Sequence, residues 1–484
     1  MKQEKELLPR KSEDLSKWYL SLIDLAKLAD YGPAKGTMVI RPYAYAIWEQ
    51  VQKVLDKWFK SDGVQNAYFP MLIPSSLLER EKSHVEGFSP ELAVVTIGGG
   101  KQLEEPLVVR PTSEAIMYEM FSKWIASYKD LPLKINQWVN VVRWELRTFP
   151  FLRTSEFLWQ EGHTVHATEK EAMEMTLKAL EWYQKFYEDY FAISSYIGEK
   201  SGSERFAGAK RTFSVELVMP DGKALQGATS HYLGQNFSQA FNIQYSDDHN
   251  KRQFAHQTSW GLSTRSLGGL IMVHGDDHGL ILPPRVAPYQ VVIITVNAKD
   301  DETDAKIRAY TRTIEDLLKK ARIRYIVDDN NEKGLGYRIN EAEIQGIPVR
   351  LIIGKSEYEE KFVTFSRRDK TAAKEKVRIN GLGEFITTHM EEMQLDLLAA
   401  SRKKKEEMTV DVETFEEFEK VMSENKKFIR AYWDESQVVE AKIKEKTKAT
   451  TRVIEIDRML NEEDGTCVYS GNKARRKWLF AQSY

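Results

Sequence analysis

One segment, Val141–His163, concentrates the cationic and aromatic side chains that phosphate and base recognition require. Its opening valines favour a strand, on one face of which Arg143 and Glu145 would lie together. A loop over Arg147–Pro150 would then turn the chain, and the arginines that flank the turn could bind phosphate oxygens bidentately. Aromatic residues of the returning strand would stack on a base: Phe151, Phe157 and Trp159. The segment therefore predicts a site for a polyphosphate and a planar ring.

Residue types alone leave an alternative, because an Arg–Glu pair on a strand is often a cross-strand ion pair and alternating aromatics are often core. The complete string, RWE…FLRTSEFLWQEGH, is more specific. It resembles motif two of the class II aminoacyl-tRNA synthetases, in the form typical of the prolyl-tRNA synthetase family. The resemblance implies that ATP is bound by Arg143, Glu145, Arg153, Thr154 and Phe157.

A second segment, VVRPTSE, ends a predicted strand and opens a helix at Thr112 and Ser113. On its own it is as well explained by a plain helix cap. In the prolyl-tRNA synthetase family, which it resembles, this segment holds the amino acid. The resemblance implies that Thr112 and Glu114 lie at the ammonium end of the substrate.

A third segment, QGATSHYLGQNF, is rich in small residues that let a backbone approach a ligand. By strand alternation Gln226, Thr229 and His231 are expected on one side, although a lone histidine is more commonly a satisfied core residue. The resemblance implies that this segment lines both the ATP and the proline pockets.

A fourth segment, SWGLSTR, begins at Ser259 and resembles motif three, whose arginine grips the outer phosphates and packs on the adenine. Arg265 takes that position, and Ser263 stands where eukaryote-like enzymes commonly have threonine. Without the resemblance, Arg265 would be an ordinary surface arginine. The nearby pattern H-G-D-D-H, 274–278, has metal-ligand residue types, but the family has no metal there.

The resemblance also implies the reaction, in which ATP activates L-proline to prolyl-adenylate for transfer to tRNA(Pro). Arg143 is expected between the carboxylate and the α-phosphate, and Mg²⁺ is expected on ATP with Glu145 or Gln226 nearby. The small imino-acid ring needs aromatic walls and a carboxylate or hydroxyl at its nitrogen. The predicted proline-binding residues are Thr112, Glu114, Arg143, Trp159, Glu161, His163, Phe206, His231 and Ser259.

Composition fits a multidomain soluble protein. The 484 residues exceed one core, and hydrophobic residues at 42% with charged residues at 29% are ordinary for globular chains. The charged start of the chain and the lack of a long apolar run predict a cytoplasmic protein without a membrane segment. A net charge of −2 gives no general attraction to nucleic acid, and we expect no DNA partner. The single Cys467 excludes a four-cysteine zinc site, so no structural zinc is predicted.

The chain divides at a proline-rich stretch, 282–288. Before it, strands and helices mix without strict βαβ alternation, so residues 1–283 are expected to form an α+β catalytic domain with a central antiparallel sheet. Regular alternation follows and predicts a small α/β domain with a largely parallel sheet over 284–400, which resembles the anticodon-binding domain of the class IIa synthetases. There the resemblance implies that Glu343 and Arg350 read anticodon bases, although a surface ion pair explains them equally well.

Residues 401–484 are expected to form a small α/β extension like that of the archaeal and eukaryote-like enzymes, in which a terminal tyrosine points toward the active site. That extension often binds zinc, but Ser470 and Val453 stand where cysteines would be. A strand over Ala67–Ile73 resembles motif one of the family, which implies a homodimer.

Two alternatives to a prolyl-tRNA synthetase stay open. The chain could be a class II synthetase for another amino acid or an inert RNA-binding paralogue. The HIGH and KMSKS motifs are absent, which disfavours the Rossmann-based synthetases.

Overall fold

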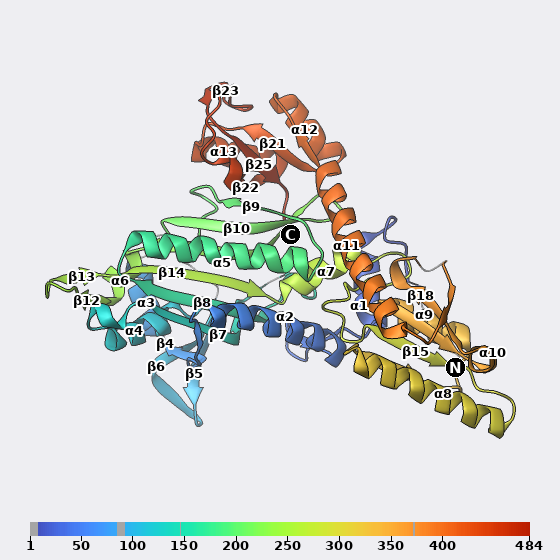
Figure 1. Ribbon diagram of the computed structural model, residues 1–484. Helices are drawn as coiled ribbons and strands as arrows, with labels where there is room; N and C mark the ends of the chain where they lie inside the picture. The colour runs from blue at the N-terminus through green and yellow to red at the C-terminus, as the bar shows by residue number, and fades with distance from the viewer. Residues whose placement is uncertain (1–7, 85–91, 146, 371–372) are drawn as a thin grey trace.

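The computed structural model describes residues 8–84, 92–145, 147–370 and 373–484. A central body of sheet and helices lies between two smaller domains, and helix α11 (Leu382–Glu407) runs past it from one to the other (Figure 1). Residue 400, where we expected the second domain to end, lies inside this helix. In the part of the chain that the structure describes, every helix is too short or too polar to cross a bilayer.

The central body is built on an antiparallel sheet, which confirms the predicted class of fold. Its strands, in spatial order, are β9 (Ser195–Glu199), β10 (Arg211–Val218), β11 (Ala224–Gly234), β14 (His256–Ser263), β8 (Glu156–His166) and β7 (Leu133–Val142), followed by the parallel edge strand β3 (Gln65–Asn66). Helix α5 (Glu169–Asp189) packs across β11 and β14. The opposite face of these strands carries the cavity described in the next subsection.

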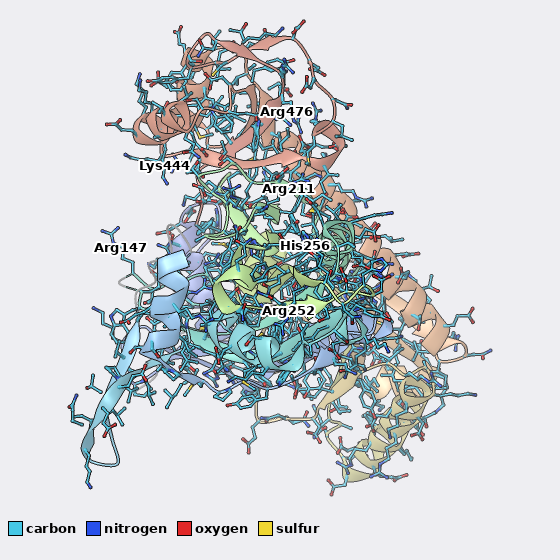
Figure 2. All side chains as sticks on the ribbon, turned by 90° about the vertical axis from the view of Figure 1, so that its left-hand side faces the viewer. Arg147, Arg211, Arg252, His256, Lys444 and Arg476 are labelled. Carbon is cyan, nitrogen blue, oxygen red and sulfur yellow. The ribbon has the colours of Figure 1, made fainter. Side chains whose placement is uncertain are left out.

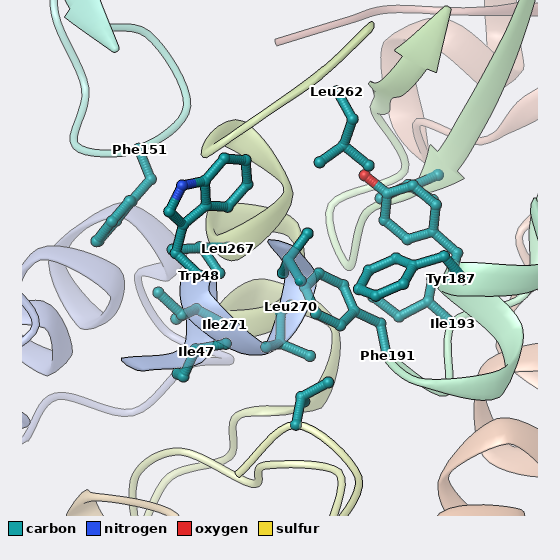
Figure 3. Close-up of a cluster of buried hydrophobic side chains, with 14 of the residues drawn as sticks. Ile47, Trp48, Phe151, Tyr187, Phe191, Ile193, Leu262, Leu267, Leu270 and Ile271 are labelled. Atoms are coloured by element: carbon teal, nitrogen blue, oxygen red, sulfur yellow. The ribbon is translucent and has the colours of Figure 1, made fainter. Parts of the chain in front are cut away.

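The core under the sheet is formed by α1 (Leu15–Leu25), α2 (Pro42–Ser61), α5 and α7 (Arg265–His274). Helix α2 buries one apolar stripe at helical spacing, and its Phe59 meets Trp260 of β14 at 4.8 Å between ring centroids. Phe151 belongs to this core beside Trp48 (Figure 3), with φ at +59°. Our expectation that Phe151 lies on the returning strand is wrong, because the residue lies in the loop before β8, and its stacking on a base stays a prediction.

The remaining elements of the central body surround the sheet. They are β1 (Ala29–Tyr31), β2 (Met38–Ile40), β4 (Leu72–Pro74), α3 (Ser75–His84), β5 (Ala93–Gly98), β6 (Lys101–Val109), α4 (Glu114–Trp124), α6 (Asn236–Phe241), β12 (Gln244–Ser246) and β13 (Arg252–Phe254). The strand expected over Ala67–Ile73 is shorter than predicted, since β4 begins at Leu72 and pairs with β6. The preceding Pro70 lacks an N–H and cannot extend that ladder.

The second domain has a five-stranded sheet of order β16-β15-β17-β18-β19. Strand β15 (Val291–Thr295) is parallel to β16 (Tyr325–Asp328) and β17 (Val349–Ile353), whereas β18 (Phe362–Arg367) and β19 (Glu375–Arg378) are antiparallel. The expectation of a largely parallel sheet is thus wrong for half of its pairings, because a hairpin extends the βαβ unit. Helices α8 (Asp301–Lys320), α9 (Leu335–Ile344) and α10 (Lys355–Glu360) complete the domain.

The C-terminal domain shares the central sheet. Its strands β20 (Thr409–Asp411), β21 (Phe428–Tyr432), β25 (Lys477–Ala481) and β22 (Thr450–Glu455) continue past β9, giving eleven strands in one sheet. Helices α12 (Phe415–Glu424) and α13 (Gln437–Thr447) and the short hairpin β23 (Gly465–Thr466) and β24 (Lys473–Ala474) flank them. The chain ends beside β10 (Figure 1), where the Tyr484 hydroxyl donates to Asp221 at 2.9 Å. The terminal tyrosine therefore lies at the β10–β11 turn and not in the cavity described next.

Candidate active site

A cavity of about 290 Å³ opens on the face of the central sheet away from α5. A smaller lobe of about 70 Å³ adjoins it and shares Arg143, Phe157, Ser263 and Arg265 as walls. The larger lobe is lined by the predicted residues Thr112, Glu114, Trp159, Glu161, His163, Phe206, Gln226, Thr229, His231 and Ser259. The smaller lobe is lined by Glu145, Arg153 and Thr154. The structure thus brings together every residue predicted to bind ATP or proline.

Arg143 lies where the two lobes meet. The residue follows the end of β7 and does not belong to the strand, so the expected sharing of a strand face by Arg143 and Glu145 is wrong. Its Nε donates to the carbonyl of Pro111 at 3.0 Å, and its guanidinium stands over the rings of Phe157 and Trp159 at 5.6 and 5.4 Å. Burial lowers the pKa of Arg143. The aromatic faces and the backbone bond fix the cation in place.

The smaller lobe gathers two further arginines. Arg265 begins α7 and donates from Nε to the carbonyl of Leu152 at 2.9 Å. Burial and the like charges of Arg143 and Arg153 lower the pKa of Arg265. Glu145 faces Arg153 at 3.8 Å. Because three cations converge around one carboxylate, this end of the cavity favours a multiply charged anion.

The other end of the cavity carries carboxylates. Glu114 opens α4 and accepts from the Thr112 hydroxyl. Glu161 on β8 accepts from Ser113 at 2.5 Å and from Gln137 at 2.7 Å, and lies 3.0 Å from His163 Nε2. Burial acts to raise the pKa of Glu161, but its hydrogen bonds, chiefly with His163, hold that pKa below the usual value. Two carboxylates around a small space favour a cationic group.

A third wall combines a ring stack with hydroxyls. The rings of Phe206 and His231 lie 4.6 Å apart, and Thr212 Oγ1 contacts His231 Nδ1 at 3.1 Å. Burial, with Lys200 and His163 nearby, lowers the pKa of His231 to about 3, so the ring is neutral at physiological pH. A neutral aromatic wall suits an apolar ligand.

Gln226 and Thr229 share the cavity face because of a bulge. Glu216 pairs with Gln226 while Val215 pairs with Ala228, so one residue of β11 is skipped. Residues three apart lie on opposite faces of a regular strand, so our alternation argument was wrong for Gln226 and the shared face comes from the bulge. The buried Ser259 hydroxyl, on the adjacent β14, has no hydrogen-bond partner among the described residues, so it is available to a ligand in the cavity.

Three lining residues lie outside the four motif segments and were not predicted: Lys200, Glu204 and Thr212. They belong to a stretch, EKSGSERFAGAKRT, whose charges indicate a solvated loop in the sequence. Lys200 is nevertheless 6% exposed. Its backbone N–H donates to the carbonyl of Thr212 on β10. This hydrogen bond draws the loop onto the sheet and explains why the Lys200 side chain is buried.

Outside the cavity, Glu343 and Arg350 pair with each other at 2.8 Å, and Arg350 is 7% exposed. The residues of the 274–278 pattern have other partners. His274 Nε2 contacts the carbonyl of Phe191, and Asp276 pairs with Arg368. Among the described residues no cluster of three or more histidine, cysteine or carboxylate side chains could hold a metal.

The sheet and the cavity define the catalytic core of a class II aminoacyl-tRNA synthetase. Residues 96–274 match the family described as "tRNA synthetase class II core domain (G, H, P, S and T)", and residues 290–389 match "Anticodon binding domain". Residues 415–484 match "Prolyl-tRNA synthetase, C-terminal".

Whole-chain similarities identify the amino acid. Proline–tRNA ligases of Borreliella burgdorferi and Rubrobacter xylanophilus are 49% and 47% identical, each over 99% of this chain and 100% and 99% of their own. Crystal structures of prolyl-tRNA synthetase from Cryptosporidium parvum, one with halofuginone and AMPPNP and one with L-proline and AMP, give TM-scores of 0.94 and 0.93 at 41% and 39% identity. Both cover 99% of this chain, which covers 99% and 97% of them. The chain belongs to the prolyl-tRNA synthetase family, the proline–tRNA ligases.

Proposed function

We propose that the two-lobed cavity binds L-proline in its larger lobe and the phosphates of ATP beside its smaller lobe, with Arg143 between them. The enzyme activates L-proline to prolyl-adenylate and transfers it to tRNA(Pro), releasing pyrophosphate and AMP. The single observation that carries the proposed arrangement is the position of Arg143, which forms a wall of both lobes.

Two anions must meet in this reaction, the proline carboxylate and the α-phosphate. Arg143 lowers their repulsion and stabilises the charge that grows on the phosphate as the carboxylate attacks. Arg153 and Arg265 bind the outer phosphates, so that the leaving group points away from the amino acid. Thr154 and Phe157 contact the nucleotide, with Gln226, Thr229 and Ser263. The nucleophile is already ionised, so the step needs no general base.

Proline is recognised by its charge and its ring. Glu114 and Thr112 receive the secondary ammonium, and Glu161 and His163 hold that end of the cavity in shape. Trp159, Phe206 and His231 enclose the ring, and Ser259 offers an unpaired hydroxyl. Alanine would also fit, because one or two methylenes are worth only about 1–3 kcal/mol apiece.

Mg²⁺ accompanies ATP in this proposal. It prefers oxygen ligands, and the carboxylate of Glu145 and the amide oxygen of Gln226 lie on the cavity walls. The 3.8 Å separation of Glu145 from Arg153 leaves its oxygens available. When bound, the ion would supply positive charge to the phosphates.

We further propose that residues 1–283, 284–400 and 401–484 are the catalytic, anticodon-binding and C-terminal units of a cytoplasmic enzyme of the archaeal and eukaryote-like type. The match of residues 415–484 to the prolyl-tRNA synthetase C-terminal family supports the subtype. In the anticodon-binding domain, Glu343 and Arg350 would read bases by exchanging their mutual ion pair for contacts with base edges.

Homodimer formation is supported by apolar side chains near β4. Tyr68 is 72% exposed, and Met71 and Leu72 are 37% and 39% exposed. Exposed rings and aliphatic groups in one short segment are typical of a protein interface. The resemblance of this segment to motif one supports the same assignment.

Proline-dependent exchange of labelled pyrophosphate into ATP tests the proposed function. We expect exchange with proline to exceed that with each of the other amino acids, with alanine the strongest competitor. Equal or greater exchange with another amino acid would overturn the assignment of the larger lobe to proline.

A further inference from the structure

One wall of the larger lobe is a loop, residues 200–206, whose back is covered by the C-terminal domain. Lys200, Glu204 and Phe206 face the cavity. Between them, Ser201 is 3% exposed although it lies in a loop between two strands. What buries it is the junction of helix α13 and strand β22. Figure 2 shows Lys444 of α13 at the edge of the C-terminal domain that meets the central body.

The carboxylate of Glu440, on α13, is the centre of this contact. It is 4% exposed and accepts from the hydroxyls of Ser201, at 2.9 Å, and Ser203. It also accepts from Thr451 of β22, whose hydroxyl lies 2.9 Å from that of Ser201. A buried carboxylate is costly unless hydrogen bonds satisfy it, so the loop hydroxyls and Glu440 depend on each other.

A second buried contact holds the start of the loop. Arg452 of β22 donates to Glu216 of β10 from Nε and Nη2, at 3.1 and 2.9 Å. The other oxygen of Glu216 lies 3.5 Å from Nζ of Lys200. Burial acts to raise the pKa of Glu216, but Arg452 and Lys200 hold it below the usual value, so the carboxylate stays ionised between two cations. Arg452 thereby helps to fix Lys200 in the cavity wall.

We propose that Glu440 and Arg452 are positioning residues for the amino-acid half of the active site, so that the C-terminal domain sets the shape of the proline pocket. The inference rests on the proposed assignment of the larger lobe to proline. The loop that these residues hold ends at Phe206, whose N–H donates to Thr212 Oγ1 at 3.0 Å beside His231. Displacing the loop therefore moves the ring wall of that pocket.

The nucleotide half is expected to be insensitive to the same contacts. Phe157, Ser263 and Arg265 are carried by β8, β14 and α7. Strands β14 and β8 lie further along the sheet from β22 than β9 and β10 do, with β11 between. Loss of the Glu440 contacts should therefore separate the KM for proline from the KM for ATP, which general destabilisation would not do.

The test uses the full chain in proline-dependent pyrophosphate exchange. Glu440→Ala should raise the KM for proline roughly tenfold, the effect of about 1.4 kcal/mol of lost binding, and leave the KM for ATP within about twofold. Glu440→Gln keeps an oxygen acceptor and should recover part of the loss. Glu445→Ala makes the same change at an exposed position of the same helix and should leave both constants unchanged.

Ser203→Ala provides a second variant on the loop itself, in case Glu440→Ala fails to fold. It removes one of the donors to Glu440 and should raise the KM for proline in the same direction. A folded Glu440→Ala or Ser203→Ala enzyme with an unchanged KM for proline, or with an equal rise for ATP, would overturn the inference. Loss of proline-dependent exchange in the unmodified enzyme would instead overturn the proposed function.

Discussion

Arg368 and Asp276 form a bidentate ion pair that joins the anticodon-binding domain to the catalytic domain. Nη1 and Nη2 of Arg368 lie 3.0 and 2.5 Å from the two carboxylate oxygens of Asp276. Asp276 follows the end of α7, the helix that begins with Arg265. Arg368 also donates from Nε to the carbonyl of Glu343. The side chain of Glu343 pairs with Arg350, and these two residues are the proposed base-reading pair. One arginine therefore contacts both the segment that follows α7 and the C-terminal end of α9.

Removing this ion pair should weaken the contact between the two domains and lower the stability of the enzyme. Arg368→Gln should lower the free energy of unfolding by about 1–3 kcal/mol, because the Asp276 carboxylate loses its cationic partner and the Glu343 carbonyl loses a donor. Asp276→Asn should cost a similar amount, and the double variant should cost less than the sum, as urea denaturation would show. Lys370→Gln, which disrupts an exposed pair with Asp396, is the control. Additive effects of Arg368→Gln and Asp276→Asn would contradict the coupling.

Gly162 allows β8 to pass under the ring of Trp260. A Cβ added at Gly162 would lie 2.3 Å from ring atoms of Trp260, which is itself held by Phe59 and Trp182. We expect Gly162→Ala to destabilise the enzyme by about 1–3 kcal/mol and to reduce exchange, since the neighbouring residues on β8 line the cavity. Gly336→Ala, in α9 with open space around it, should be neutral or slightly stabilising. An unchanged melting temperature for Gly162→Ala would show that the ring can move aside.

Much of this arrangement could be predicted from the sequence. Apolar spacing in the sequence predicts helices over 43–60 and 168–190, and each end of the observed α2 and α5 lies within one residue of these ranges. The motif residues could be assigned to one site because their types match a known pattern over long stretches. Local periodicity and motif chemistry were therefore sufficient for the central body and its cavity.

The errors come from contacts between distant parts of the chain. Phe151 was expected on the returning strand, but it lies in the loop before β8 with a left-handed backbone and packs in the core. Lys200 was missed, because its local sequence does not show that contacts with Thr212 and Glu216 of β10 draw it onto the sheet. The continuation of the central sheet through β22 also has no local signal, because it depends on pairing with β9, more than two hundred residues earlier. Such long-range pairings cannot be read from spacing in one segment.

The C-terminal domain should be stable without zinc. Asp434 accepts from the Ser470 hydroxyl at 2.6 Å and from the Asn472 amide at 3.0 Å, which closes the loop after Cys467 by hydrogen bonds. Cys467 is 2% exposed, and its N–H donates to the Asn472 carbonyl. Treatment with a strong chelator, followed by return of Mg²⁺, should leave exchange and the melting temperature unchanged. One zinc per chain by elemental analysis, with a fall in melting temperature on its removal, would contradict this.

His274 should make the enzyme sensitive to acid. Burial lowers its pKa to about 4, whereas an unfolded histidine titrates near 6.5. Between these two pKa values His274 binds a proton in the unfolded chain but not in the folded state. The free energy of unfolding therefore falls as the pH drops from about 6.5 toward 4. At pH 5 the loss from one such group is about 2 kcal/mol. His274→Gln, which can still donate to the Phe191 carbonyl, should reduce the difference in unfolding free energy between pH 7 and pH 5.

The exposed His249 is the matched control for that measurement, since its side chain is 87% exposed. His249→Gln should leave the difference between pH 7 and pH 5 as it is in the unmodified enzyme. His166 and His231, whose pKa values burial lowers to about 4 and about 3, act in the same direction and will remain in both variants. An equal loss of stability in the His274→Gln and unmodified enzymes would mean that the pKa of His274 is the same in the folded and unfolded states.

Arg143 should be the residue on which activation depends most. Arg143→Ala removes the cation between the two lobes and should lower kcat for pyrophosphate exchange by about 10²–10³, the usual effect of losing one electrostatic donor in the transition state. Arg143→Lys keeps the charge but loses the planar fork, so it should recover only part of the rate.

The fold should survive these substitutions, because Arg143 follows the end of β7 and makes its side-chain bond to a single carbonyl, that of Pro111. A melting temperature close to that of the unmodified enzyme would separate a chemical defect from unfolding. Arg153→Ala is the internal comparison. It should raise the KM for ATP more than it lowers kcat, because the proposed arrangement places Arg153 at the outer phosphates and not at the reacting centre. Near-normal turnover by a folded Arg143→Ala enzyme would remove the basis for placing proline and ATP on either side of this guanidinium.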